Sequence, residues 1–297
     1  MKRRALVRVA AGTVVGAAGM AFLAACGAAP AKTPTSSTTK STSTTKSKST
    51  TGSSAKATSS TSPKAGTGWV PAATNPLAAL TAPQAKGTVN IKGTMDSTWT
   101  GAQKYTITAT NAIVQGVGST FKTSPPLKSS DVYLQWDKNN LYVLENRVNT
   151  AAGLPITGTS TYTSMYLSNS LGVFFSNSQL TTASYSIPGH YTVWGEPRGP
   201  SGDHKPHIWL RAGGNGKEVD TFPTWPIAAT INTTGYVMTM AIPWSQLQAV
   251  PFTVEKGTRI AFTLLATASG PTGTPWGQLM LVGDGDQPST WGVLTLQ

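Results

Sequence analysis

The chain has 297 residues, a single cysteine and a formal net charge of +12 at pH 7. Residues 1–87 hold 11 of the 23 Lys and Arg and none of the 11 Asp and Glu, which leaves 12 cations against 11 anions in residues 88–297. This nearly neutral part excludes the positive footprint of a nucleic-acid-binding domain. It has no thiol for a disulfide or a metal, and it is long enough to bury a core without either.

The chain begins with four cations in its first eight residues, followed by the uncharged stretch 9–25 and then Cys26. A charged start and an apolar middle are typical of a secretory signal. The run Leu23-Ala24-Ala25-Cys26 resembles the bacterial lipoprotein signal, in which the cysteine is acylated and the chain is cut just before it. The resemblance implies a signal peptide over 1–25 and a lipid on Cys26. An uncleaved anchor is the alternative, because about 17 uncharged residues approach the length that spans a bilayer.

Residues 26–87 consist largely of Ser, Thr, Lys, Ala, Gly and Pro. The part 33–61 has no aromatic and no large aliphatic residue, so it cannot bury enough apolar surface to offset the entropy of ordering it. We predict a disordered tether with an end-to-end distance of roughly 45 Å. Its lysines favour solubility and attraction to anionic lipid or wall polymer. Together with the signal, the tether predicts a protein displayed on the extracytoplasmic face of the bacterial membrane.

From residue 88 onward, short runs of β-branched and aromatic residues alternate with turn residues, which is typical of strands. One hairpin is clear: 131–136 alternates apolar and polar residues, and Asp137-Lys138-Asn139-Asn140 has turn chemistry. A short helical turn is expected at 243–247. The pattern predicts an all-β, antiparallel sandwich of the immunoglobulin or jelly-roll kind. Strands are expected near 89–92, 105–108, 131–136, 141–147, 171–176, 191–196, 207–211, 228–231, 236–242, 259–267, 278–282 and 293–296.

Four segments over residues 88–297 resemble the family 9 carbohydrate-binding modules and the wider DOMON-like sandwiches. The resemblance implies one carbohydrate-binding sandwich domain over 88–297. The family's signature aromatics are expected in the core, and Asp137 is expected to cap its turn. The segments are 89–93 with Trp99; 132–137 with Trp136, then 141–143 with Tyr142; 235–237, then 241–244 with Trp244 and Leu247; and Pro288 with Trp291, Gly292 and Leu294.

The resemblance also implies a site in which two tryptophans hold a sugar ring among polar groups. Tyr166 occupies the first stacking position, but the family's glutamate falls on Gly172 and its aspartate on Asn149. The loop 283–287, where the second tryptophan is expected, has no aromatic. We expect other aromatics to replace it, because a pyranose needs a flat apolar face to stack on. The candidates, which we expect in loops or at sheet edges, are Trp194, Trp209, Trp225 and Trp276, with Trp225 and Trp276 each serving as either a platform or a packing plug.

Two short segments carry possible metal ligands. Asp203-His204-Lys205-Pro206-His207 contains a histidine pair beside a carboxylate, and Asp284-Gly285-Asp286 resembles part of a calcium loop. Because both lack further ligands, we expect no metal or other cofactor, with calcium as the alternative. The chain has no nucleophile motif, zinc-protease motif or phosphate loop. We therefore expect no catalytic residue and no enzyme activity.

The predicted function is a surface-tethered, monomeric lipoprotein that binds a glycan by aromatic stacking and binds no nucleic acid. Two alternatives stay open. One is a sandwich without a ligand that serves as a spacer or docks a protein. The other is a b-type haem module of the DOMON kind, which could draw on Met165, Met238, Met240 and Met280 opposite His190, His204 or His207.

Overall fold

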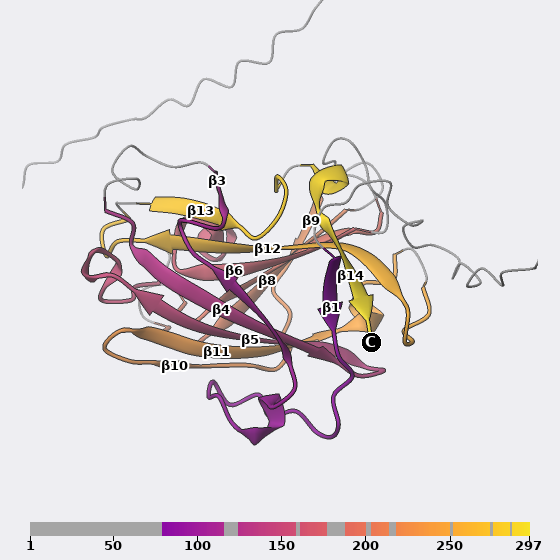
Figure 1. The fold of residues 1–297 in the computed structure, drawn as a ribbon. Helices are drawn as coiled ribbons and strands as arrows, with labels where there is room; N and C mark the ends of the chain where they lie inside the picture. Colours follow the sequence, from indigo (N-terminus) through magenta and orange to yellow (C-terminus); the bar gives the residue numbers. More distant parts are fainter. Residues whose placement is uncertain are drawn as a thin grey trace, which may run out of the picture. The chain divides into compact units, whose positions relative to one another are not determined.

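The computed structural model describes residues 79–115, 124–158, 161–176, 188–199, 203–213, 218–249, 252–273, 276–285 and 287–297. These residues form two β-sheets packed face to face, with short 3-10 turns at their margins (Figure 1). The predicted all-β sandwich is therefore confirmed. The signal, Cys26 and most of the predicted tether lie outside the described residues. Within these residues no helix has the length and hydropathy needed to span a bilayer.

One sheet has five antiparallel strands. Its centre is the long β4–β5 hairpin that the sequence predicted, and it lies on the lower side of the sandwich in Figure 1. In spatial order the strands are β10 (Ile227–Ile231), β11 (Gly235–Pro243), β5 (Asn140–Asn149), β4 (Leu127–Trp136) and β2 (Gln103–Ile107).

The second sheet has nine strands, and its long strand β12 (Arg259–Ser269) pairs with β14 through its first half and with β13 through its second half. All its pairs are antiparallel except β1–β14. The main path is β1 (Ala79–Ala82), β14 (Gly292–Leu296), β12, β6 (Ser170–Ser176), β7 (His190–Glu196), β8 (His207–Gly213) and β9 (Glu218–Thr221), and β13 (Trp276–Met280) carries β3 (Ile113–Gln115).

Five 3-10 turns complete the described residues. Of these, η3 covers part of the nine-stranded sheet. The turns are η1 (Ser97–Trp99), η2 (Ala151–Gly153), η3 (Tyr162–Leu167), η4 (Trp244–Gln246) and η5 (Pro288–Thr290). The helical turn expected at 243–247 is confirmed as η4.

Two strand predictions need correction. Residues 89–92 form no strand; Val89 instead packs with Trp99 and Tyr142 on the outside of the five-stranded sheet. Conversely, the strand β1 lies inside the predicted tether, and its Leu80 and Ala82 are buried in the core. The folded part therefore begins at or before Ala79 and not at residue 88. Four residues of modest strand propensity do not predict a strand alone; β1 forms because β14 offers it an edge.

The apolar residues that alternate along the predicted hairpin lie in the core between the sheets. Val132, Leu134 and Trp136 share its face of β4, as expected. Each signature aromatic is at most 8% exposed, which confirms their scaffold role. Asp137 caps the hairpin turn, because its Oδ1 accepts hydrogen bonds from the backbone N–H groups of Asn139 and Asn140 at 2.8 Å each.

A buried ion pair joins the two sheets. Arg147 and Glu145 on β5 both point into the sandwich with fully buried side chains, and Arg147 Nη2 lies 2.6 Å from Glu145 Oε1. Arg147 also donates to the backbone carbonyls of Thr267 on β12 and Ser170 on β6. Glu145 accepts from Ser130 Oγ at 2.6 Å and from the Tyr236 hydroxyl at 2.8 Å. Loss of the guanidinium would remove one donor from each of these two carbonyls, of which that of Ser170 also lies 3.3 Å from Thr267 Oγ1.

The face of the nine-stranded sheet that points away from the five-stranded sheet, which we call the outer face, carries a second apolar cluster. It includes Phe174 on β6, Trp194 on β7, Trp209 on β8 and Trp291 beside β14. His190 is 1% exposed, and its ring centroid lies 5.4 Å from that of Trp291. Burial, with a smaller contribution from the positive charge of Arg211, lowers the pKa of His190 from 6.5 to about 4.

Arg147→Met is expected to destabilise the fold by about 3–5 kcal/mol, because it leaves the Glu145 carboxylate buried without its cation. The control is Lys104→Met, which removes the half-exposed partner of Asp131 and should cost less than about 1 kcal/mol. Chemical denaturation of both variants measures this. Equal losses in the two variants would contradict a structural role for the buried pair.

His190 should make the fold less stable in acid. Above pH 6.5 the imidazole is neutral in both the folded and unfolded states, so it has no effect on the pH dependence. As the pH falls from 6.5 to about 4, the unfolded chain binds a proton that the folded chain does not, which lowers the free energy of unfolding by about 3 kcal/mol. His190→Gln should lack this loss. Urea unfolding of wild type and variant between pH 7 and 4 tests it, and parallel curves would show the prediction to be wrong.

Candidate functional site

The turn η3 lies over the outer face and contacts strands β6, β7, β8, β12 and β13. Hydroxyl groups beneath it hold its backbone: the carbonyl of Met165 accepts from Ser170 Oγ at 2.6 Å and from Ser168 Oγ at 2.9 Å. Thr267 Oγ1 donates to the carbonyl of Ser168 at 2.7 Å. Trp276 Nε1 donates to the carbonyl of Tyr166 at 3.0 Å. The sheet therefore fixes where η3 presents its side chains.

Aromatic rings gather on and under η3. The ring centroid of Tyr166 lies 6.4 Å from that of Trp194 and 6.3 Å from that of Trp209. These two tryptophans are a cross-strand pair on β7 and β8, with centroids 6.3 Å apart. They are only 4% and 1% exposed, whereas Tyr166 is partly exposed. The buried pair therefore forms a floor that supports Tyr166 from below.

A second pair of rings lies beside this floor. Tyr162, also on η3, packs against Phe222, which follows β9, with ring centroids 5.5 Å apart. Phe222 is 48% exposed, so it is the most solvent-accessible of these rings. Neither residue was predicted as a site residue from the sequence. Tyr162 stands four residues before Tyr166, and this spacing of two tyrosines is the sequence signal that could have identified Tyr162.

Polar groups surround these rings. The Tyr162 hydroxyl donates to Asp203 Oδ2 at 3.3 Å, and the same oxygen lies 2.8 Å from His207 Nε2. Burial pulls the pKa of Asp203 upward, but the hydrogen bond and charge of His207, with further hydrogen bonds, hold it below its usual value. Burial and the Asp203 carboxylate raise the pKa of Tyr162. Tyr162 therefore stays a hydrogen-bond donor at neutral pH.

Asp220 on β9 and Arg211 on β8 both contact Trp209 and hold its ring in place within the floor. Asp220 Oδ1 accepts from Trp209 Nε1 at 3.0 Å and lies 3.4 Å from Arg211 Nε. The Arg211 guanidinium carbon lies 4.8 Å from the centroid of the Trp209 ring, a distance at which a cation and an aromatic face attract each other. The strands β6 to β9 and the turn η3 therefore form an outer face that has half-exposed rings and charged groups at its margin.

The aromatic candidates from the sequence fall into three groups. Tyr166 and Trp276 are both partly exposed and hydrogen-bonded to each other at η3. Trp194 and Trp209, expected in loops or at edges, lie instead in the strands β7 and β8 and have almost no exposed surface. Trp225 packs against the core between the sheets, within the segment that crosses from β9 to β10, which favours the packing plug over the platform.

The departures from the family pattern have a physical explanation. A Cβ on Gly172 would meet Phe174 Cε1 at 2.7 Å and Trp194 Cζ3 at 3.1 Å, so aromatic rings occupy the space that a glutamate would need. Asn149 is 6% exposed, and its amide donates to the carbonyl of Gly153 and to Asn169 Oδ1. In the loop 283–287, the carbonyl of Asp284 accepts from Trp291 Nε1 at 2.6 Å. These positions serve packing in this chain.

Of the possible metal ligands, Asp203 and His207 are in contact, whereas the methionine candidates for haem divide between the two apolar clusters. No group of three or more His, Cys, Asp or Glu gathers in the described part of the chain. Asp286 of the possible calcium loop lies outside that part. Met238 and Met240, as expected, share a face of β11, and both are buried in the core between the sheets. Met165 and Met280 belong to the outer-face cluster, and His204 is exposed.

Comparisons with known proteins agree with this architecture. In the search of solved structures, a family 9 carbohydrate-binding module from Caldicellulosiruptor kristjanssonii, in complex with cellotriose, matches with a TM-score of 0.50 and 14% identity, over 74% of this chain and 94% of that one. The structure with glucose from the same organism matches with a TM-score of 0.45 and 14% identity, over 73% and 95%.

The search of curated proteins found no match. The family model described as carbohydrate family 9 binding domain-like matches residues 91–297, which is most of the chain and nearly all of its described part. By that match, the chain belongs to the carbohydrate family 9 binding domain-like family.

Proposed function

We propose that the chain is a carbohydrate-binding module whose ligand lies on the η3 platform, which we define as Tyr162, Tyr166, Phe222 and Trp276. The observation that carries this is the exposure of these rings above a rigid floor. Phe222 is 48% exposed, and the three other rings are partly exposed. The family and the solved module with bound cellotriose support carbohydrate as the ligand class.

The platform differs from a clamp of two facing tryptophans. Tyr162 and Phe222 pack on each other with centroids 5.5 Å apart, so a sugar ring has no room between them and would lie across them. The C–H face of a pyranose would then cover the exposed rings, while its hydroxyls reach the polar groups at the margin. Asp203 and His207 are the nearest such groups, because both contact Tyr162. An open platform of this kind gives millimolar to micromolar affinity, about −4 to −8 kcal/mol.

We further propose that the module is non-catalytic and is held by a lipid on Cys26 at the extracytoplasmic face of the bacterial membrane, as a monomer. The basis is the signal-like segment 1–25 and the composition of the residues that follow it. The tether is shorter than residues 26–87, because the segment from Ala79 belongs to the sandwich. The remaining residues, about fifty, still give an end-to-end distance of roughly 40 Å.

Tyr166→Ala and Phe222→Ala should each weaken binding of the best oligosaccharide by about 1–2 kcal/mol, because each removes a ring face from the platform. A glycan array identifies that oligosaccharide, and isothermal titration calorimetry gives the affinities. Met95→Ala is the matched control, since Met95 is 43% exposed but lies before η1, on the side of the five-stranded sheet. Unchanged affinity in both ring variants would remove the platform from the binding site, and an array without any hit would count against carbohydrate binding.

Intact-mass analysis of protein extracted from membranes should show loss of residues 1–25 and the added mass of acyl chains. Cys26→Ser should abolish the acyl mass, because no other thiol is available in the chain. A full-length, unmodified wild-type chain would show that the proposed anchor is wrong.

A further inference from the structure

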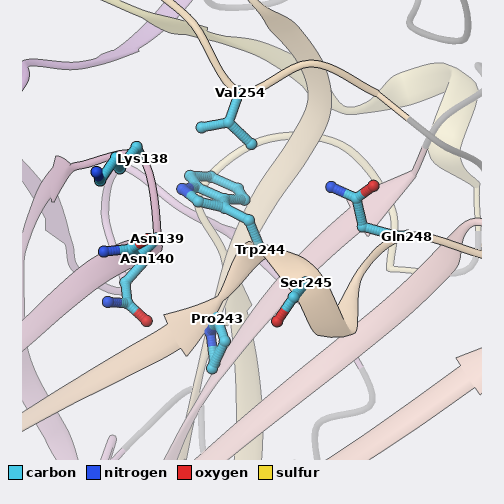
Figure 2. A pocket seen from close by; sticks show the side chains of 8 residues that line it. All are labelled: Lys138, Asn139, Asn140, Pro243, Trp244, Ser245, Gln248 and Val254. Carbon is cyan, nitrogen blue, oxygen red and sulfur yellow. The ribbon is translucent and has the colours of Figure 1, made fainter.

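A pocket lies at the turn of the β4–β5 hairpin, where η4 approaches it. It is lined by the turn residues 138–140, the segment 243–245, Gln248 and Val254, and we call it the hairpin pocket. Its volume is about 520 Å³, within the range of small-molecule sites. Figure 2 shows the hairpin side chains on one side, Gln248 on the other, and Trp244 between them.

The lining is suited to a ligand rich in hydroxyl groups. Asn139, Asn140 and Gln248 line the pocket with side-chain amides, and Ser245 adds a hydroxyl. Asn140 and Gln248 each use one N–H, on Tyr142 and on the carbonyl of Phe252 respectively, which leaves a second N–H and the carbonyl oxygen for a ligand. A hydroxyl group is itself both donor and acceptor, so amides match it well. Trp244 serves as a wall and not as a stacking face, because it is 1% exposed and its Nε1 donates to the carbonyl of Asp137 at 2.9 Å. Binding here would rely on hydrogen bonds.

The two walls of the pocket are fixed relative to each other. Asp137 Oδ1 accepts the backbone N–H groups of Asn139 and Asn140, which sets the turn. The backbone N–H of Trp244 donates to the carbonyl of Asn139 at 2.9 Å, which joins η4 to that turn. A preformed site loses less conformational entropy when a ligand binds than a flexible one does.

The charge of the lining points to an acidic ligand. Lys138 is the one charged residue among those that line the pocket, and no carboxylate lines it. Lys138 is exposed, and among the described residues it takes part in no ion pair. We propose that the hairpin pocket is a second saccharide site that accepts a uronic acid unit, with its carboxylate on Lys138 and its hydroxyls on the amides and Ser245.

This site is separate from the η3 platform, so the inference goes beyond the proposed function. Strand β5 runs from Asn140 at the pocket to Asn149, which contacts Asn169 just after η3. Nine strand steps of about 3.3 Å separate the two ends by roughly 30 Å. Two sites at this separation on one module allow a polymer to be held at two points, which raises avidity without any new contact.

The test is a titration of the full-length, ¹⁵N-labelled protein with trigalacturonate and with cellotriose, followed through its side-chain amide signals. Trigalacturonate should shift the signals of Asn139, Asn140 and Gln248 in the wild type and also in Tyr166→Ala. The Kd should rise about tenfold in the double variant Lys138→Ala/Gln248→Ala. Lys128→Ala, which removes an exposed lysine at the start of β4, should leave it unchanged. Cellotriose should bind this pocket about fivefold more weakly, which corresponds to the upper range of one exposed charge contact.

The outcomes separate the two proposals. Absence of shifts at these three amides, or an equal loss in Lys128→Ala, would overturn the hairpin pocket even if the η3 platform binds sugar. Equal affinity for cellotriose would overturn the assignment of an acidic unit. Signal shifts at the pocket amides, together with affinities that Tyr166→Ala and Phe222→Ala leave unchanged, would support the hairpin pocket as a saccharide site. They would also overturn the η3 platform as one. A melting temperature of the double variant equal to that of the wild type would show that the variant is folded.

Discussion

The buried pair of Arg147 and Glu145 is the interaction on which the geometry of this sandwich depends. Apolar side chains alone allow two sheets to slide and rotate against each other, because dispersion and area burial are not directional. The guanidinium of Arg147 instead reaches two carbonyls on β6 and β12 in the opposite sheet. Two fully desolvated charges are tolerated only when each is paired and hydrogen-bonded. This requirement fixes the register of the two sheets at one end of the molecule.

That end is also where η3 is attached. Ser170, whose carbonyl accepts from Arg147, uses its own hydroxyl to hold the carbonyl of Met165 in η3. Thr267, the other carbonyl partner of Arg147, holds Ser168 through its hydroxyl. The core ion pair and the turn η3 are therefore two hydrogen bonds apart. A rigid core contact of this kind explains how a 3-10 turn of six residues can present aromatic rings in a fixed position.

Much of the fold could be predicted from the sequence, because the long strands β4, β5, β11 and β12 combine alternation with turn residues at their ends. The short strands β1, β3 and β9 could not, because three or four residues carry too little pattern and gain their hydrogen bonds from distant neighbours. The candidate site was harder for the same reason. The sequence does not distinguish Trp194 and Trp209 from the other aromatic candidates for the site. Their burial beneath Tyr166 follows from the pairing of β7 with β8. Phe222 is exposed because it follows the edge strand β9, a property that no local pattern records.

The parallel pairing of β1 with β14 determines how this domain would respond to mechanical load. Where the chain before Ala79 is the tether proposed above, a pull on it reaches the sandwich at Ala79 and runs along the axis of β1. A glycan fixed to a surface would supply the opposing pull through the body of the domain. The ladder with β14 is then sheared, so its hydrogen bonds share the force and do not open one after another. Such an attachment resists drag better than a hairpin peeled from its end.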